Sequence, residues 1–120
     1  MKFEDRKIEK ALIIELEGFS TTETAVGFVD ILKKEVSKVT TTSYSLIVDS
    51  TNLSAFKPDI LPILEKCYKL YMGFGFKKIF IVNPKTTTAR MQIQRIAKSS
   101  KFTGIFVDGL DKALDQAKSL

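Results

Sequence analysis

The feature that most constrains this chain is the alternation of short apolar runs with longer segments that repeat at helical spacing. Strand-length apolar runs occur at residues 11–17, 44–49, 78–82 and 104–107, and a first strand at 2–7 can pair with 11–17 as a hairpin. Between and after the later runs, apolar residues recur every three or four positions, which is typical of amphipathic helices. The order predicts an α/β domain with a mixed, mainly parallel sheet of four to five strands flanked by four helices.

The helix starts can be placed from local signals. Ser20 and Glu23 have the spacing of a capping box, so a helix is expected to begin at Ser20. Pro62 is tolerated only in the first turn of a helix. With Asp59 as its N-cap, the second helix places Pro62 there, and it is expected to end before Gly73 or Gly75. Two further helices are expected at residues 86–99 and after 108–109.

Length and composition predict a single globular domain over residues 1–120. Apolar residues make up 44% of the chain and charged residues 28%, as in ordinary globular proteins. No apolar run approaches the roughly 20 residues that cross a bilayer. The charged residues 1–7 are not followed by the apolar stretch of a signal peptide. We therefore expect no membrane span and a cytoplasmic location.

The residue types disfavour catalysis. The chain has no histidine, which excludes Ser-His-Asp and Cys-His nucleophilic systems and histidine-ligated zinc. Its one cysteine, Cys67, cannot form an intramolecular disulfide and lies in a helical apolar pattern, so we expect a buried hydrophobic residue. No cofactor, metal site or enzymatic activity is expected.

Charge is distributed unevenly along the chain. The net charge is +5, and no acidic residue lies between Glu65 and Asp108, a stretch with nine basic residues. Such a half-molecule can attract anionic partners, or it can be a solvated basic face without a specific ligand. Nucleic acid is disfavoured as the partner, because most aromatic residues fall at core-facing positions and not on an exposed stacking surface.

The order of elements and their landmarks resembles the STAS domain, named for sulfate transporters and anti-sigma-factor antagonists. Residues 12–18 resemble the family's second strand and its closing glycine, and residues 46–53 resemble the central strand that leads into the regulatory loop. Residues 78–84 and 105–114 resemble the later strands and the closing helix. The resemblance covers residues 10–120 and implies a SpoIIAA-like STAS fold.

The sequence departs from the family at its regulatory positions. Anti-sigma-factor antagonists carry a serine at the start of the second helix, which a dedicated kinase phosphorylates, whereas Pro58 or Asp59 stands there in this chain. The aspartate that follows the family's first glycine is replaced by Thr21. The usual phosphoserine switch is therefore not expected, and the chain resembles divergent stand-alone members of the family.

The first candidate site is the connection from Ser50 to Asp59. Ligands and partners of α/β sheets gather at the carboxyl ends of parallel strands. The expected partner-binding residues are Ser50, Asn52, Ser54, Phe56, Lys57, Pro58 and Asp59. Phe56 either packs into the core or makes an exposed contact. The alternative is an ordinary strand-to-helix connection whose polar side chains cap and solvate.

The second candidate is an anion site at the start of the 86–99 helix. A helix start offers free backbone N–H groups, and basic side chains add positive charge. The residues are Asn83, Lys85, Thr86, Thr87 and Arg90. The alternative is that Asn83 or a threonine only caps the helix.

Together these features favour a non-enzymatic regulatory module that binds a protein, such as an anti-sigma-factor or kinase-like regulator. The alternative is a carrier of a lipid or anionic metabolite with the same architecture. A closed apolar pocket beside the second helix would favour the carrier, and a filled core there would favour the module.

Overall fold

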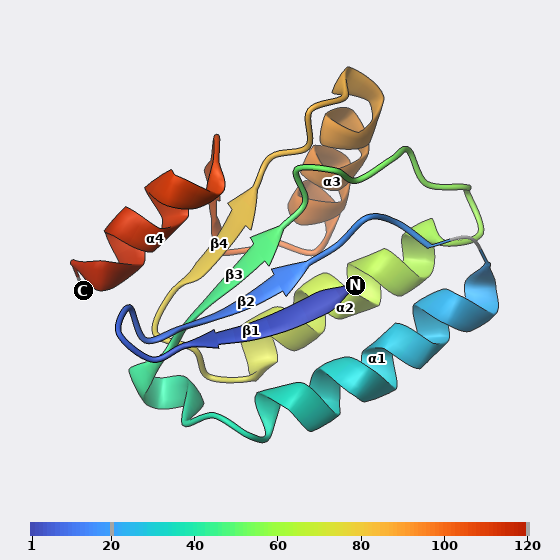
Figure 1. Cartoon of the computed structure of the whole chain (residues 1–120). Helices are drawn as coiled ribbons and strands as arrows, with labels where there is room; N and C mark the ends of the chain where they lie inside the picture. The colour runs from blue at the N-terminus through green and yellow to red at the C-terminus, as the bar shows by residue number, and fades with distance from the viewer. Residues whose placement is uncertain (20, 120) are drawn as a thin grey trace.

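Five strands form one sheet in chain order (Figure 1). The computed structural model describes residues 1–19 and 21–119. The strands are β1 (Lys2–Arg6), β2 (Ala11–Glu15), β3 (Ser45–Asp49), β4 (Ile79–Val82) and β5 (Ile105–Val107). β1 pairs with β2 antiparallel, and the other neighbours are parallel. The predicted hairpin and the mainly parallel sheet are confirmed.

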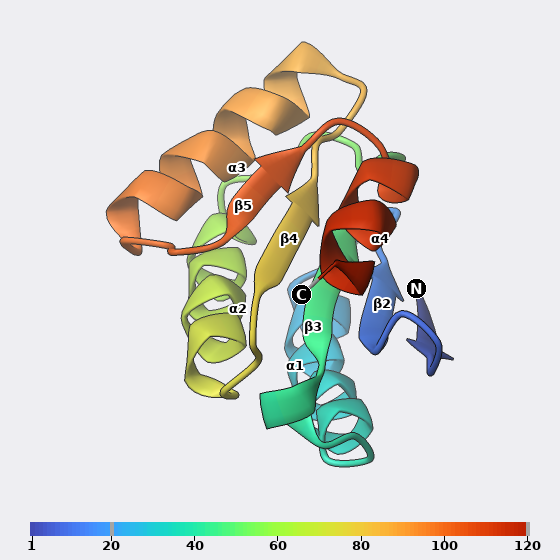
Figure 2. The same cartoon turned by 90° about the vertical axis from the view of Figure 1, so that its left-hand side faces the viewer.

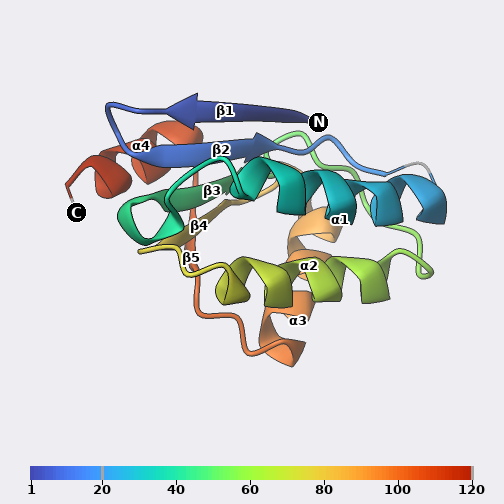
Figure 3. The same cartoon turned by 90° about the horizontal axis from the view of Figure 1, so that it is seen from below.

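Helices cover both faces of the sheet (Figures 2 and 3). The larger layer consists of α1 (Thr22–Val36), α2 (Leu61–Gly73) and α3 (Thr87–Ser99), and α4 (Leu110–Lys118) packs on the opposite face. A short 3₁₀ turn, η1 (Thr41–Ser43), precedes β3. Within residues 1–19 and 21–119, no helix combines the length and the apolar composition needed to cross a membrane.

Alternation along the strands separates two cores. In β2, Leu12 and Ile14 point into the larger core, whereas Ala11 and Ile13 point toward α4. Successive side chains of a strand face opposite sides of the sheet, so a strand covered on both faces needs apolar residues at every position. This explains the continuous apolar runs from which the strands were predicted.

The start of α1 differs slightly from the expectation. The expected cap, Ser20, lies outside the described residues, and Thr21 holds the N-cap position. The Thr21 hydroxyl accepts from the Thr24 N–H at 3.1 Å, and the Thr24 hydroxyl accepts from the Thr21 N–H at 3.2 Å. Two threonines three residues apart therefore form the reciprocal pair that the pattern assigned to Ser20 and Glu23.

The prediction that Asp59 caps α2 is wrong. The helix begins at Leu61, and Ile60 holds the cap position without a side-chain hydrogen bond. Ile60 is fully buried, and its carbonyl accepts from the Leu64 N–H at 3.0 Å. Burying this isoleucine places the N-cap one residue beyond Asp59 and the helix start at Leu61. Pro62 still lies in the first turn, as predicted.

The inner face of α2 is filled by large side chains. Leu64, Cys67, Tyr68 and Tyr71 are each at most 2% exposed. The rings of Tyr68 and Tyr71 lie 5.6 Å apart. The burial of Tyr68 was not expected from the sequence pattern. The space between α2 and the sheet is thus occupied.

Burial of Cys67 makes its thiol inert at neutral pH. Burial raises the pKa of this thiol from 9.0 to about 12. We expect a disulfide reagent such as Ellman's reagent to leave the folded protein unmodified at pH 8 and to react with one thiol in denaturant. Since the unfolded thiol ionises first, the free energy of unfolding should fall as pH rises from about 9 toward 12. Rapid modification of the folded protein would contradict the prediction.

Candidate functional site

The two sequence-predicted clusters lie side by side at the carboxyl edge of the parallel strands. The loop from residue 50 to residue 60, here the β3–α2 loop, follows β3, and the second cluster follows β4. The Lys85 N–H donates to the Thr51 carbonyl at 3.1 Å, and the Ser50 N–H donates to the Val82 carbonyl at 3.2 Å. The parallel sheet therefore joins segments that are more than thirty residues apart in the sequence.

Asp49 sets the direction in which the β3–α2 loop leaves the sheet. Its carboxylate accepts from the Thr51 N–H at 3.1 Å and from the Thr51 hydroxyl. An aspartate that bonds to the backbone two residues later forms a side-chain turn. The strand thus ends in a turn that its own last residue stabilises. Asp49 was not among the predicted site residues.

Burial divides the predicted partner-binding residues into two groups. Ser50 is 1% exposed and Phe56 is 6% exposed, so these two side chains belong to the interior. The remaining five residues are exposed, namely Asn52, Ser54, Lys57, Pro58 and Asp59. Of the two positions considered for Phe56, the structure shows the packed one. The loop therefore presents a polar surface above an apolar anchor.

A glutamine from α3 holds the loop at its anchor. The Gln92 side-chain oxygen accepts from the Phe56 N–H at 2.8 Å, and its amide nitrogen donates to the Phe56 carbonyl at 3.0 Å. One side chain thus satisfies both backbone groups of a residue 36 positions away. The sequence gives only a weak signal for this contact, a polar residue beside the thin apolar stripe of α3.

Aromatic stacking joins the loop to the segment before α1. The Phe56 ring lies 6.4 Å from the Phe19 ring, which lies 5.4 Å from the Phe28 ring. At the surface above them, the Thr22 hydroxyl donates to the Asp59 carboxylate at 2.8 Å. The start of α1 and the end of the β3–α2 loop therefore meet at one surface (Figure 1).

The exposed side chains at this junction line a shallow open hollow. Thr21, Thr22, Glu23, Lys57 and Asp59 surround it. Two carboxylates and one ammonium group make it weakly acidic. We call the eight exposed residues here the loop surface, and they are Thr21, Thr22, Glu23, Asn52, Ser54, Lys57, Pro58 and Asp59.

The predicted anion site already contains a carboxylate of the protein. Asp108, which follows β5, accepts from the Arg90 guanidinium and from the Asn83 side-chain amide, both at 2.9 Å. Arg90 is therefore neutralised where an external anion was expected. Lys85, Thr86 and Thr87 are exposed beside this pair, and Thr86 is the N-cap of α3 without a side-chain cap bond. From the sequence, Asp108 was expected only in the turn before the last helix.

The structure offers no grouped set of metal ligands among residues 1–19 and 21–119, where no three Cys, Asp or Glu side chains come together. Beside α2, the interior is packed by the tyrosines and leucines described above. The hollows at both edges of the sheet are open and lined largely by polar side chains. The chemistry that these surfaces support is recognition through hydrogen bonds and charge.

Comparison with known proteins confirms the predicted fold. The chain is similar to an uncharacterised protein of the DUF3478 family from Shewanella loihica PV-4, whose crystal structure has a SpoIIAA-like fold. The two share 19% sequence identity over 97% of this chain and 90% of the other, with a TM-score of 0.66. No protein-family model and no curated protein matches the chain. The likeness establishes a SpoIIAA-like α/β fold.

The Gln92 contact can be tested by its removal. Gln92→Ala leaves the Phe56 N–H and carbonyl without their partner, so the free energy of unfolding should fall by about 1–2 kcal/mol. Hydrogen exchange at the Phe56 amide should quicken. Gln94→Ala, on the exposed side of the same helix, is the matched control and should stay within about 0.5 kcal/mol of wild type. Equal effects of the two substitutions would contradict the anchoring role.

The Asp59 contact makes a separate prediction. Asp59→Ala and Thr22→Ala remove the same exposed hydrogen bond, so each should cost about 0.5 kcal/mol and the double variant no more than either alone. Thr21→Ala, which removes the α1 cap, should cost about 1 kcal/mol. Urea unfolding measures all four. An Asp59→Ala cost that persists undiminished in the Thr22→Ala background would show that Asp59 supports α2 instead.

Proposed function

We propose that a chain with this SpoIIAA-like fold acts as a non-enzymatic regulatory module that binds another protein through the loop surface. The observation that carries the proposal is the construction of the β3–α2 loop, in which exposed polar residues stand on a buried and hydrogen-bonded anchor. Phe56 is packed against Phe19 and is held by Gln92 on both of its backbone groups.

A loop anchored in this way suits protein recognition. Ordering a loop on binding costs conformational entropy, and a loop that is already ordered avoids much of that cost. The loop surface offers amide, hydroxyl, ammonium and carboxylate groups from two segments, residues 21–23 and 52–59. Such a mixture favours a partner of mixed polarity, such as an anti-sigma-factor or kinase-like regulator, over a small apolar ligand.

We propose further that this module has no phosphoserine switch of the usual form. Asp59 carries a fixed charge at the position where related regulators carry a serine, and its carboxylate is bonded to Thr22. Phosphorylation of a serine adds about −2 charges and can be reversed. A carboxylate carries about half of that charge permanently. The partner would thus meet one state of the surface. Phosphate on Ser54 after treatment with a cognate-type kinase would contradict this.

The carrier alternative is disfavoured by the packing beside α2. A lipid or an apolar anion needs a cavity that encloses most of its surface. Tyr68, Tyr71 and Leu64 fill the interior at the place where that cavity was expected. The filled core is the feature that was expected of the module.

The proposal can be tested by site-specific photo-crosslinking. A photoreactive phenylalanine analogue at Ser54 should capture one protein of discrete mass in extracts of the cells that express the chain. The same analogue at exposed Lys112, on α4 at the opposite face, is the matched control. Excess wild-type protein should compete for the capture, whereas excess Lys57→Glu protein should compete at least tenfold less well. Equal capture from Ser54 and Lys112, or equal competition, would refute the loop surface as the binding site.

A further inference from the structure

A second hollow lies at the amino edge of the sheet, opposite the loop surface. It has a volume of about 180 Å³ and is lined by Lys10, Lys77, Lys118, Ser43, Ser45 and Glu9, with Ile8 at its rim. Three separate parts of the chain bring the lysines together, namely the β1–β2 turn, the segment before β4 and the end of α4. None of the three forms an ion pair with a residue that the structure describes.

The backbone around the hollow is fixed by the sheet. The Ser45 N–H donates to the Lys10 carbonyl at 2.9 Å, and the Lys77 N–H donates to the Tyr44 carbonyl at 2.9 Å. Lys10 has a φ of 52°, a left-handed conformation that closes the β1–β2 turn. The positions from which Lys10 and Lys77 extend are therefore set by strand pairing.

Ser45 adds a hydroxyl to the hollow. The residue is only 2% exposed, yet it lines the hollow. Its hydroxyl takes part in none of the side-chain hydrogen bonds of residues 1–19 and 21–119 and is not closed off from solvent, so it is open to the hollow. The neighbouring Ser43 differs, because its hydroxyl already donates to the Thr40 carbonyl at 3.0 Å. Ser45 thus offers an unused donor at the floor of a basic hollow.

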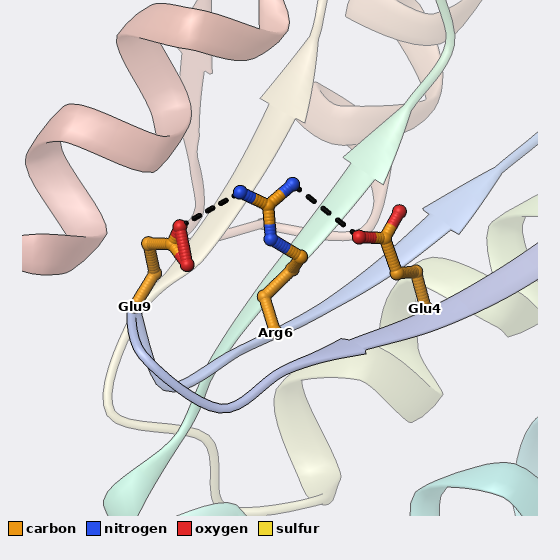
Figure 4. A network of polar contacts seen from close by, with 3 residues as sticks. All are labelled: Glu4, Arg6 and Glu9. Carbon is orange, nitrogen blue, oxygen red and sulfur yellow. Dashed lines mark hydrogen bonds and ion pairs between the residues drawn. The ribbon is translucent and has the colours of Figure 1, made fainter.

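The one carboxylate at the hollow is already engaged. Glu9 accepts from the Arg6 guanidinium at 2.9 Å, and Glu4 lies on the other side of the same guanidinium at 3.3 Å (Figure 4). Both carboxylates raise the pKa of Arg6, so this arginine stays charged and offsets Glu9. Asp111 and Asp115 line the adjoining hollow with Lys118, but none of the three lysines forms an ion pair with a described residue, in contrast to Arg90 at the other edge.

We propose that this hollow binds a phosphate monoester group, with Lys10, Lys77 and Lys118 as its cationic partners and the Ser45 hydroxyl as a further donor. Ammonium groups and a hydroxyl supply several donors to one anion, and a phosphate monoester has about −2 charges and three acceptor oxygens to receive them. The site lies at the opposite edge from the loop surface and does not depend on the protein-binding proposal.

The phosphate can belong to a soluble metabolite or to a lipid headgroup. Ile8, which is 87% exposed at the rim, is an apolar side chain that could enter a bilayer while the lysines contact headgroups. The chemistry at the hollow is the same in both cases. The experiment therefore has a soluble arm and a membrane arm.

In the soluble arm, glycerol 3-phosphate is titrated into the protein and followed by amide NMR shifts. Saturable shifts are expected at Lys10, Ser45 and Lys77, and the affinity should fall as salt is added. Lys77→Gln and Ser45→Ala should each weaken binding about fivefold to tenfold, because each removes a donor to a charged group. The matched controls Lys34→Gln on α1 and Ser54→Ala on the loop surface should stay within twofold.

In the membrane arm, sedimentation is measured with phosphatidylcholine vesicles that contain about one fifth phosphatidic acid, and with vesicles that contain phosphatidylserine instead. Preferential binding to phosphatidic acid, lost in Lys77→Gln and in Ile8→Ser, identifies a lipid headgroup. Saturable glycerol 3-phosphate binding without vesicle binding identifies a soluble ligand.

Two results would overturn the proposal. One is the absence of saturable binding in both arms. The other is an equal loss of affinity in Lys77→Gln, Ser45→Ala and their controls, which would indicate non-specific attraction to a basic surface. Thermal unfolding of each variant shows that it is folded. Ser45→Ala removes no hydrogen bond within the described chain, so its melting temperature should stay close to that of wild type.

Discussion

Coverage of the parallel strands on both faces is the constraint on which the rest of the structure depends. β2, β3 and β4 have buried side chains at nearly every position, so each face needs its own helical layer. The larger layer of α1, α2 and α3 covers one face, and α4 covers the other. Because the helices occupy the faces, the loops at the two ends of the parallel strands remain open, and the two proposed binding surfaces lie there.

The sequence carried enough information for the fold because this constraint acts locally. Apolar residues at every position of a short run, separated by amphipathic helices, predict covered parallel strands, and the strands and helices lie where they were expected. The errors concern element starts. Asp59 has the side chain of a cap, yet Ile60 determines where α2 begins, because a fully buried isoleucine outweighs one capping hydrogen bond.

The candidate site was only partly predictable, because its defining contacts are long-range. The position of the β3–α2 loop could be predicted, because the strand that leads into it was predicted correctly. The Gln92 contact with Phe56 spans 36 residues and the Thr22 contact with Asp59 spans 37, so neither leaves a local pattern. The three lysines at the amino edge are likewise distant in the sequence. Charge counting pointed to the basic stretch between Glu65 and Asp108, to which only Lys77 of these three lysines belongs.

The basic side chains form an ion pair at one edge of the sheet and not at the other, and this difference bears on where an anion can bind. At the carboxyl edge, Arg90 is paired with Asp108, so the charge that a helix start and an arginine would offer an anion is already used. At the amino edge, Glu9 is bonded to Arg6, and Lys10, Lys77 and Lys118 form no ion pair with a described residue.

Ligands of α/β sheets usually collect at the carboxyl edge, because loops and helix N-termini meet there. In this chain that edge presents mixed polar groups on an anchored loop, which suits a protein surface. At the amino edge, lysines that form no ion pair with a described residue meet the Ser45 hydroxyl in one hollow. The charge distribution would therefore place the two proposed binding sites at opposite ends of the strands, so that a protein partner and a phosphate could be bound at the same time.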